Sequence, residues 1–102
     1  MKSFNVLIWD FNGKNLTTTD VLPYFRDEYK RAKKNERPQT INEWKEFIKR
    51  WGMYRYWSRC EYEIIVSPWP THGKSVKIDV WDQINSNIDI IAEILYEEHI
   101  KQ

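Results

Sequence analysis

The sequence is poor in the residues from which most small catalytic and cofactor sites are built. Its 102 residues include one cysteine, two histidines and three glycines. The lone Cys60 excludes an intramolecular disulfide, and with two histidines it supplies too few ligands for a recognisable zinc site. None of the glycines lies in a glycine-rich turn between a strand and a helix, which excludes the usual dinucleotide and P-loop phosphate sites. We therefore expect neither a cofactor nor a metal.

Long hydrophobic runs are also missing. The longest is Val6–Trp9, whereas a helix that crosses a bilayer needs about 20 apolar residues. The opening Met1–Phe4 lacks the apolar stretch of a signal peptide. With 41% hydrophobic, 16% aromatic and 30% charged residues, the composition is typical of a globular chain rather than a disordered one. We expect a single soluble domain over residues 1–102, a cytoplasmic location and no membrane partner.

Charge is distributed unevenly along the chain, although the net charge is only +1. Residues 1–60 hold 13 Lys and Arg against 7 Asp and Glu, whereas residues 61–102 hold 3 against 8. Such asymmetry is typical of a chain with a charged partner, or of two halves that pack together and neutralise each other. Both interpretations stay open at the level of the sequence.

The first third of the chain predicts a β-hairpin followed by a helix. Phe4–Phe11 has the length and composition of a strand, and it carries large apolar groups on both faces. Asn12-Gly13, which follows at once, is the strongest short signal for a hairpin turn. We therefore expect a hairpin over residues 4–17. Apolar residues then recur at helical spacing, which predicts a helix over about residues 20–34.

The middle of the chain predicts a second helix with a defined start. Thr40 and Glu43 match a capping box, in which each side chain satisfies a backbone N–H of the first turn. An apolar stripe follows, so we expect a helix over about residues 41–51. Gly52 is expected to end or bend this helix.

The last third predicts strands and a long helix. Residues 60–67 alternate between apolar and polar side chains, which is typical of a half-buried strand, and residues 75–78 suggest another short one. Apolar residues spaced three and four apart predict an amphipathic helix over about residues 80–100. The fold class is α+β: a small antiparallel sheet, made of the hairpin and the strand 60–67, with three helices packed on it.

The segment Lys49–Arg59 has the most distinctive chemistry in the chain. It interleaves four cations with four large aromatic residues. Such a surface suits nucleic acid or a nucleotide, with cations on phosphates and rings under bases, and it equally suits a protein interface. Alternatively, the rings belong to the core and the arginines stack on them. The residues that we expect to bind a partner are Arg50, Trp51, Tyr54, Arg55, Trp57, Arg59 and, between two prolines, Trp69.

Catalytic constellations are weakly supported. Cys60 or Ser67 would need a histidine within reach, but no local signature places His72 or His99 beside either of them. The carboxylates of residues 61 and 63 share one face of a predicted strand, which is more often a solvated face than an acid–base pair. We therefore expect that the protein is not an enzyme.

The C-terminal helix is acidic and offers a second candidate surface. Its carboxylates are suited to imitate the phosphates of a nucleic acid, or they form an ordinary solvated face. They belong to Asp82, Asp89, Glu93, Glu97 and Glu98.

Four parts of the sequence carry a resemblance to known proteins: Trp57–Ile65, Trp69-Pro70, Lys77–Ile84 and the opening Phe4–Asn12. They resemble a family of small proteins encoded by phages and prophages of Gram-positive gut bacteria. The family has no established catalytic residues. The resemblance implies a non-enzymatic binding protein that inhibits a host defence system, with an anti-CRISPR role as its most concrete form. The partner would then be a host protein. The alternative is a binder of nucleotides or single-stranded nucleic acid, and a homodimer also stays open.

Overall fold

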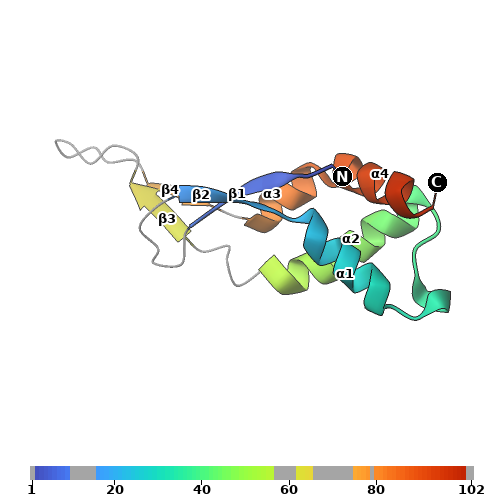
Figure 1. The fold of residues 1–102 in the computed structure, drawn as a ribbon. Helices are drawn as coiled ribbons and strands as arrows, with labels where there is room; N and C mark the ends of the chain where they lie inside the picture. The colour runs from blue at the N-terminus through green and yellow to red at the C-terminus, as the bar shows by residue number, and fades with distance from the viewer. Residues whose placement is uncertain (1, 10–15, 57–61, 66–74, 79, 101–102) are drawn as a thin grey trace.

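The computed structural model describes residues 2–9, 16–56, 62–65, 75–78 and 80–100 (Figure 1). The described residues include four α-helices, two pairs of strands and one 3₁₀ turn, and this arrangement confirms the α+β class. The predicted number of helices, three, was too low by one. In chain order the elements are β1 (Asn5–Trp9), β2 (Leu16–Asp20), α1 (Leu22–Arg31), η1 (Lys34–Glu36), α2 (Ile41–Tyr56), β3 (Tyr62–Ile65), β4 (Ser75–Ile78), α3 (Val80–Ser86) and α4 (Ile88–His99).

The strands form two separate antiparallel pairs, β1 with β2 and β3 with β4. The prediction of one sheet that joins the hairpin to the strand 60–67 was therefore wrong. One physical reason lies at the edge of β1. The backbone N–H of Leu7 donates to Gln83 Oε1 at 2.8 Å, and Gln83 Nε2 donates to the Leu7 carbonyl at 3.0 Å. A side-chain amide from α3 thus takes the hydrogen bonds that a third strand would need at this position.

Strand β1 is buried on one face. Val6 and Ile8 are 2% and 8% exposed, whereas Leu7 between them is 42% exposed. Alternation along a strand places Val6 and Ile8 on the same side, where they join the core under the helices. Although the sequence places large apolar groups on both faces of this strand, the face that carries Leu7 is exposed at that residue.

Helix α1 is shorter than predicted because strand β2 extends to its start and Arg37 binds the carbonyls at its end. Strand β2 continues to Asp20, whose Oδ1 accepts hydrogen bonds from the N–H groups of Phe4 and Leu22, both at 3.0 Å. At the other end, Arg37 donates to the carbonyls of residues 29, 30 and 32 at 3.0–3.2 Å. The Arg37 guanidinium thereby satisfies carbonyls that the helix leaves without partners.

Helix α2 begins as predicted and ends later. The N–H of Glu43 donates to Thr40 Oγ1 at 3.1 Å, which confirms Thr40 as the N-cap, and the Thr40 hydroxyl lies 3.4 Å from Glu43 Oε1. However, the helix continues through Gly52 to Tyr56, so Gly52 does not end it. An added Cβ at Gly52 would lie 2.8 Å from Cζ3 of Trp81. The glycine therefore serves close packing against α3 rather than a helix end.

The predicted helix over residues 80–100 is two helices. The break falls at Asn87, whose φ of −118° and ψ of 21° are not helical. Its side-chain amide donates to the carbonyl of Gln83 at 2.8 Å, in competition with the regular backbone pattern. The buried apolar residues of both helices still belong to one core. In Figure 1, α4 lies along α2, and α3 lies against β1.

Candidate functional site

Three of the seven predicted binding residues are described with their side chains. Arg50 and Arg55 are exposed on α2, and Trp51 between them is half-buried against the core. Tyr54 lies in the same helix, but its side chain is outside the described set. Trp57, Arg59 and Trp69 lie outside the described residues.

Each of the two described arginines is stacked on an aromatic ring, and for Arg50 on Trp51, which packs against the core, this is the alternative that the sequence left open. The guanidinium of Arg50 lies 5.2 Å from the ring centre of Trp51, and that of Arg55 lies 5.0 Å from the ring centre of Tyr24. The Tyr24 hydroxyl donates to the Trp51 carbonyl at 2.9 Å, which ties the two stacks together. Sequence reasoning missed Tyr24, because it lies on α1 and nothing local links it to α2.

A row of three hollows borders these stacks along α1, η1 and α2. Each is named after one of its residues. The Arg55 hollow, of about 330 Å³, is lined by Thr19, Asp20, Pro23, Tyr24, Asp27, Glu28, Arg31 and Arg55. The Arg50 hollow, of about 320 Å³, is lined by Glu28, Arg31, Ala32, Lys33, Glu36, Phe47, Arg50 and Trp51. The Glu46 hollow, of about 380 Å³, is lined by Glu36, Pro38, Asn42, Glu43, Glu46, Phe47 and Arg50.

The hollows adjoin one another because neighbours share lining residues. Glu28 and Arg31 belong to both the Arg55 and Arg50 hollows. Phe47 and Arg50 belong to both the Arg50 and Glu46 hollows. Together they form one groove, which we call the α1–α2 groove.

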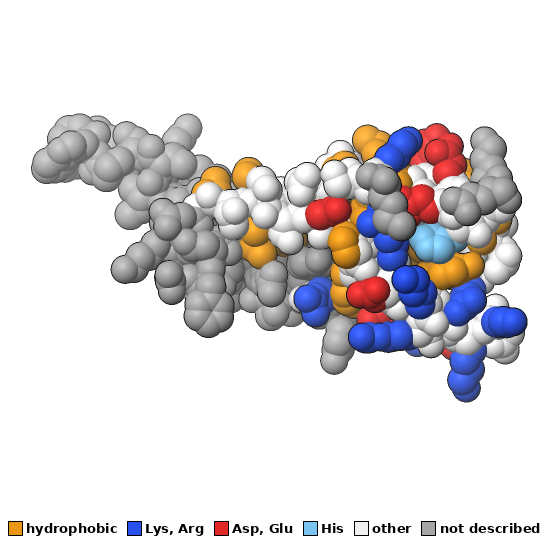
Figure 2. Space-filling view, in the orientation of Figure 1, with side chains coloured by type: hydrophobic (Ala, Val, Ile, Leu, Met, Phe, Trp, Pro, Cys, Tyr) orange, Lys and Arg blue, Asp and Glu red, His pale blue; other side chains and the backbone are white. Residues whose placement is uncertain are grey.

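Cations gather around the α1–α2 groove. Figure 2 shows Lys and Arg side chains clustered over the region of α1 and η1. Arg31 is 77% exposed and lies 3.6 Å from Glu28, a separation at which an exposed ion pair contributes little. Within the described part of the chain, Lys33, Arg50 and Arg55 have no ion-pair partner. These charges are therefore available to a partner.

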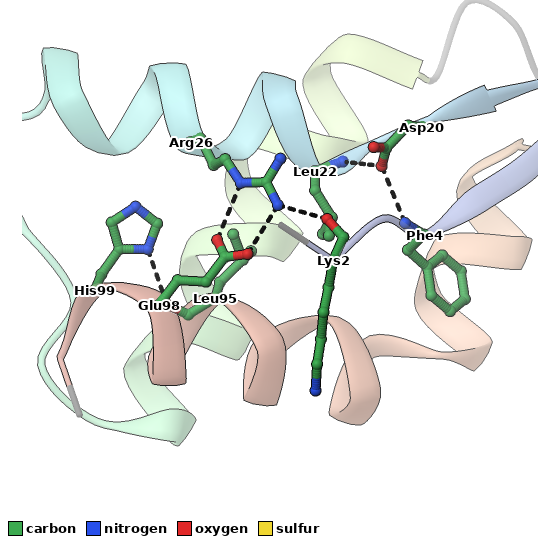
Figure 3. A network of polar contacts seen from close by, with 8 residues as sticks. All are labelled: Lys2, Phe4, Asp20, Leu22, Arg26, Leu95, Glu98 and His99. Atoms are coloured by element: carbon green, nitrogen blue, oxygen red, sulfur yellow. Dashed lines mark hydrogen bonds and ion pairs between the residues drawn. The ribbon is translucent and has the colours of Figure 1, made fainter. Parts of the chain in front are cut away.

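The acidic face of the C-terminal helix is partly committed inside the molecule. Glu98 forms a two-pronged ion pair with Arg26, at 3.0 Å from Nε and 2.8 Å from Nη2 (Figure 3). Arg26 also donates to the Lys2 carbonyl at 2.7 Å and so fixes the N-terminal segment. Asp89 lies 2.7 Å from Lys45. Glu98 is thus committed to a half-buried pair, and Asp89, which is 80% exposed, to a surface pair that contributes little. The commitment of Glu98 weakens the case for this face as a phosphate mimic.

The Arg26–Glu98 pair predicts a specific dependence of stability on pH. The hydrogen bond from Arg26 holds the pKa of Glu98 below its usual value of 4.5, and burial opposes this shift. Since the folded pKa lies below the unfolded one, the contribution is complete above about pH 4.5 and disappears as the pH falls through the lowered value. Urea unfolding should therefore show Glu98→Gln less stable than the wild type at pH 7, with the gap shrinking as the pH falls below about 4.5. A constant gap between pH 7 and pH 3 would contradict this assignment.

His99 is occupied in packing. Its ring centre lies 4.3 Å from that of Tyr29 and 5.2 Å from that of Trp44. Nδ1 lies 2.8 Å from the Leu95 carbonyl, and because a carbonyl only accepts, Nδ1 carries the hydrogen. Its proposed catalytic companions, Cys60 and Ser67, lie outside the described residues.

Over the residues that the structure describes, no group of three or more His, Cys, Asp or Glu side chains is arranged to hold a metal ion. No helix among them is long and apolar enough to cross a membrane. The chemistry that the described surface offers is that of charged and aromatic contacts.

Comparison with known proteins adds no identity. No protein-family model, curated protein or solved structure matches the chain. The resemblance to small phage proteins therefore stays a prediction. The structural basis for a proposed function is the geometry of the α1–α2 groove.

Proposed function

We propose that the protein is a non-enzymatic binding protein that docks on a host protein through the α1–α2 groove. The observation that carries this proposal is the pair of exposed arginines, Arg50 and Arg55, each held over a half-buried ring beside a hollow. Arginine and large aromatic residues dominate the hot spots of protein interfaces. Because the rings hold the guanidinium groups in place, less side-chain entropy is lost on binding.

The mixed charge of the groove favours a protein partner over nucleic acid. Acidic side chains line all three hollows together with the cations, among them Asp27, Glu28 and Glu46. A phosphate backbone is attracted by a surface of one sign, so these carboxylates would oppose it. In addition, a base that stacked on Trp51 or Tyr24 would compete with the arginine already placed there.

The biological role within this proposal is inhibition of a bacterial defence system, in the manner of an anti-CRISPR protein. The support for this role is the resemblance to small phage proteins in sequence. The support for the binding mode is the groove. The protein would act by occupying a surface of its target, since no catalytic step is invoked.

Loss of both arginine stacks is expected to weaken binding to the target at least about tenfold, because a truncated hot-spot residue costs about 2 kcal/mol. The variant is Arg50→Ala with Arg55→Ala, and the control is Lys34→Ala, an exposed cation that lines none of the three hollows. Each protein is produced in a bacterium whose CRISPR–Cas system restricts a test phage. Plaque counts then report inhibition, and a tagged copy reports the complex with the effector.

We expect the wild type and Lys34→Ala to restore plaques and to bring down the effector in stoichiometric amount, and the double variant to do neither. If the soluble double variant restores plaques as fully as the wild type, the groove is not the binding surface. If the wild-type protein restores plaques in no bacterium, whether CRISPR–Cas or another defence system restricts the phage, the inhibitor role is wrong.

The second candidate is binding of nucleotides or single-stranded nucleic acid, favoured by the cations that Figure 2 shows around α1 and η1. Its signature would be an affinity for an oligonucleotide that falls steeply with salt, since counterions are released when phosphates are bound. An affinity that changes little between low and physiological salt would reject this candidate.

A further inference from the structure

We propose that two neighbouring parts of the α1–α2 groove bind one peptide segment of the partner by charge alternation. The Arg50 hollow receives an acidic side chain, and the Glu46 hollow beside it receives a basic one. The inference rests on the proposed function, because it names what the groove recognises in the protein on which it docks. It assigns the recognised chemistry to two sites of opposite sign.

The two hollows are neighbours and are similar in size. They have volumes of about 320 Å³ and 380 Å³ and share Glu36, Phe47 and Arg50. Each volume is about ten times the share of one water molecule in the liquid, which is enough for a long side chain. One segment that passes over Phe47 can therefore place side chains in both.

The two hollows carry opposite charge. The Arg50 hollow is lined by three cations and two carboxylates. The cations are Arg31, Lys33 and Arg50, and the carboxylates are Glu28 and Glu36. Three carboxylates, Glu36, Glu43 and Glu46, and one cation, Arg50, line the Glu46 hollow. The first has an excess of one positive charge and the second an excess of two negative charges. A segment with one carboxylate and one neighbouring cation complements this pattern better than a segment of either sign alone.

Most of these charges are not held strongly by the protein itself. Glu46 lies 3.5 Å from Lys49, with the two side chains 76% and 49% exposed. Such exposed pairs contribute little and are easily exchanged for a partner's charge. Arg50 makes no ion pair within the described residues.

The apolar floor that the two hollows share at Phe47 is fixed in place, and so is one side of the Glu46 hollow. Phe47 is 8% exposed and packs edge-on against Trp44 at a ring separation of 5.4 Å. Pro38 is buried, and the hydrogen bond to the N-cap Thr40 holds the backbone of Glu43. A preformed site with an apolar floor loses little entropy on binding.

The experiment uses three capped heptapeptides as probes and the full chain labelled for NMR. The first, acetyl-Glu-Thr-Lys-Thr-Glu-Thr-Lys-amide, places alternating charges on one face of an extended chain. The second has Glu at all four charged positions, and the third has Lys. We expect the alternating peptide to bind at least about fivefold more tightly than either uniform peptide, as two weak charge pairs allow. The shifted amide signals should come from α2 and from residues 31–38.

Charge reversal in the protein provides a second, independent readout. Arg50→Glu should weaken the alternating peptide and spare the all-Lys peptide, whereas Glu46→Lys should weaken the alternating peptide and spare the all-Glu peptide. A merely structural role for either residue would not produce this exchange of preference. The exposed Lys34→Glu, outside both hollows, is the control and should leave the order of the three peptides unchanged.

The possible results separate this inference from the proposed function. Tightest binding of either uniform peptide, all-Glu or all-Lys, or no shift for any peptide at millimolar concentration, would overturn charge alternation. If Arg50→Ala with Arg55→Ala still abolishes capture of the host effector, the proposed function stands without it. If the alternating peptide binds as expected and the effector is never captured, the groove is a peptide site and the inhibitor role is wrong.

Discussion

Replacing Trp44 with alanine is expected to lower the free energy of unfolding by about 3–5 kcal/mol, the range found when a large aromatic side chain is removed from a core. Trp44 is 0% exposed and is among the largest fully buried side chains of the described residues. Its ring stacks on Tyr29 of α1 at 5.2 Å and meets His99 of α4 at the same separation. One ring on α2 therefore holds three helices together, and its loss leaves a cavity where they meet.

The control for this prediction is Trp44→Phe. The indole Nε1 is buried without a hydrogen-bond partner among the described atoms, so phenylalanine gives up volume but no hydrogen bond. We expect it to lose less than half of what alanine loses. Urea unfolding followed by circular dichroism measures both variants, with an unchanged slope as the sign of two-state behaviour. A Trp44→Ala loss under about 1.5 kcal/mol would show that the three helices do not depend on this ring.

The features of the fold that are encoded locally could be predicted from the sequence. The N-cap at Thr40 needs only one hydroxyl within the first turn of the helix, and the structure contains it. The hairpin and the apolar helix stripes are equally local, because their periods of 2 and 3.6 are properties of a single segment. The α+β class follows from these elements together.

The features that were missed depend on partners distant in the chain. The Gln83 side-chain amide binds the backbone of Leu7 at the edge of β1, and no sequence pattern near Leu7 predicts this contact. The break at Asn87 leaves the apolar spacing intact, so the spacing predicted one continuous helix. Sequence reasoning located the cationic and aromatic segment of α2. It could not supply Tyr24 or the hollows, because these arise only when α1 packs against α2.

Gly52 shows how packing overrides a local signal. A glycine near the end of an apolar stripe usually marks a helix end, but here it lies inside α2 against two rings. An added Cβ would lie 2.8 Å from Cζ3 of Trp81 and 3.0 Å from Cζ of Phe25. Both rings are buried, at 8% and 0% exposure, and so have little freedom to move away. Space, rather than backbone conformation, therefore requires glycine at this position.

Gly52→Val is accordingly expected to lower the free energy of unfolding by about 3 kcal/mol, at the upper end of the cost of overpacking a core. Gly52→Ala should lose less, because alanine regains about 1 kcal/mol of helix propensity against a cost of about 1–3 kcal/mol for the clash. The matched control is Met53→Val, which places the same side chain one position along, where the residue is 45% exposed. It should change stability by less than about 0.5 kcal/mol.

The same three variants test whether the groove depends on this contact. Gly52 packs against Phe25 of α1, and one turn further along α2 the guanidinium of Arg55 lies over Tyr24, the residue before Phe25. If valine pushes α1 away from α2, Gly52→Val should weaken capture of the partner even where the protein remains folded, and Met53→Val should not. Equal stability of Gly52→Val and the wild type in urea would mean that the rings move aside without cost. In that case the position of Arg55 over the Tyr24 ring does not depend on the close approach of α1 and α3 to α2.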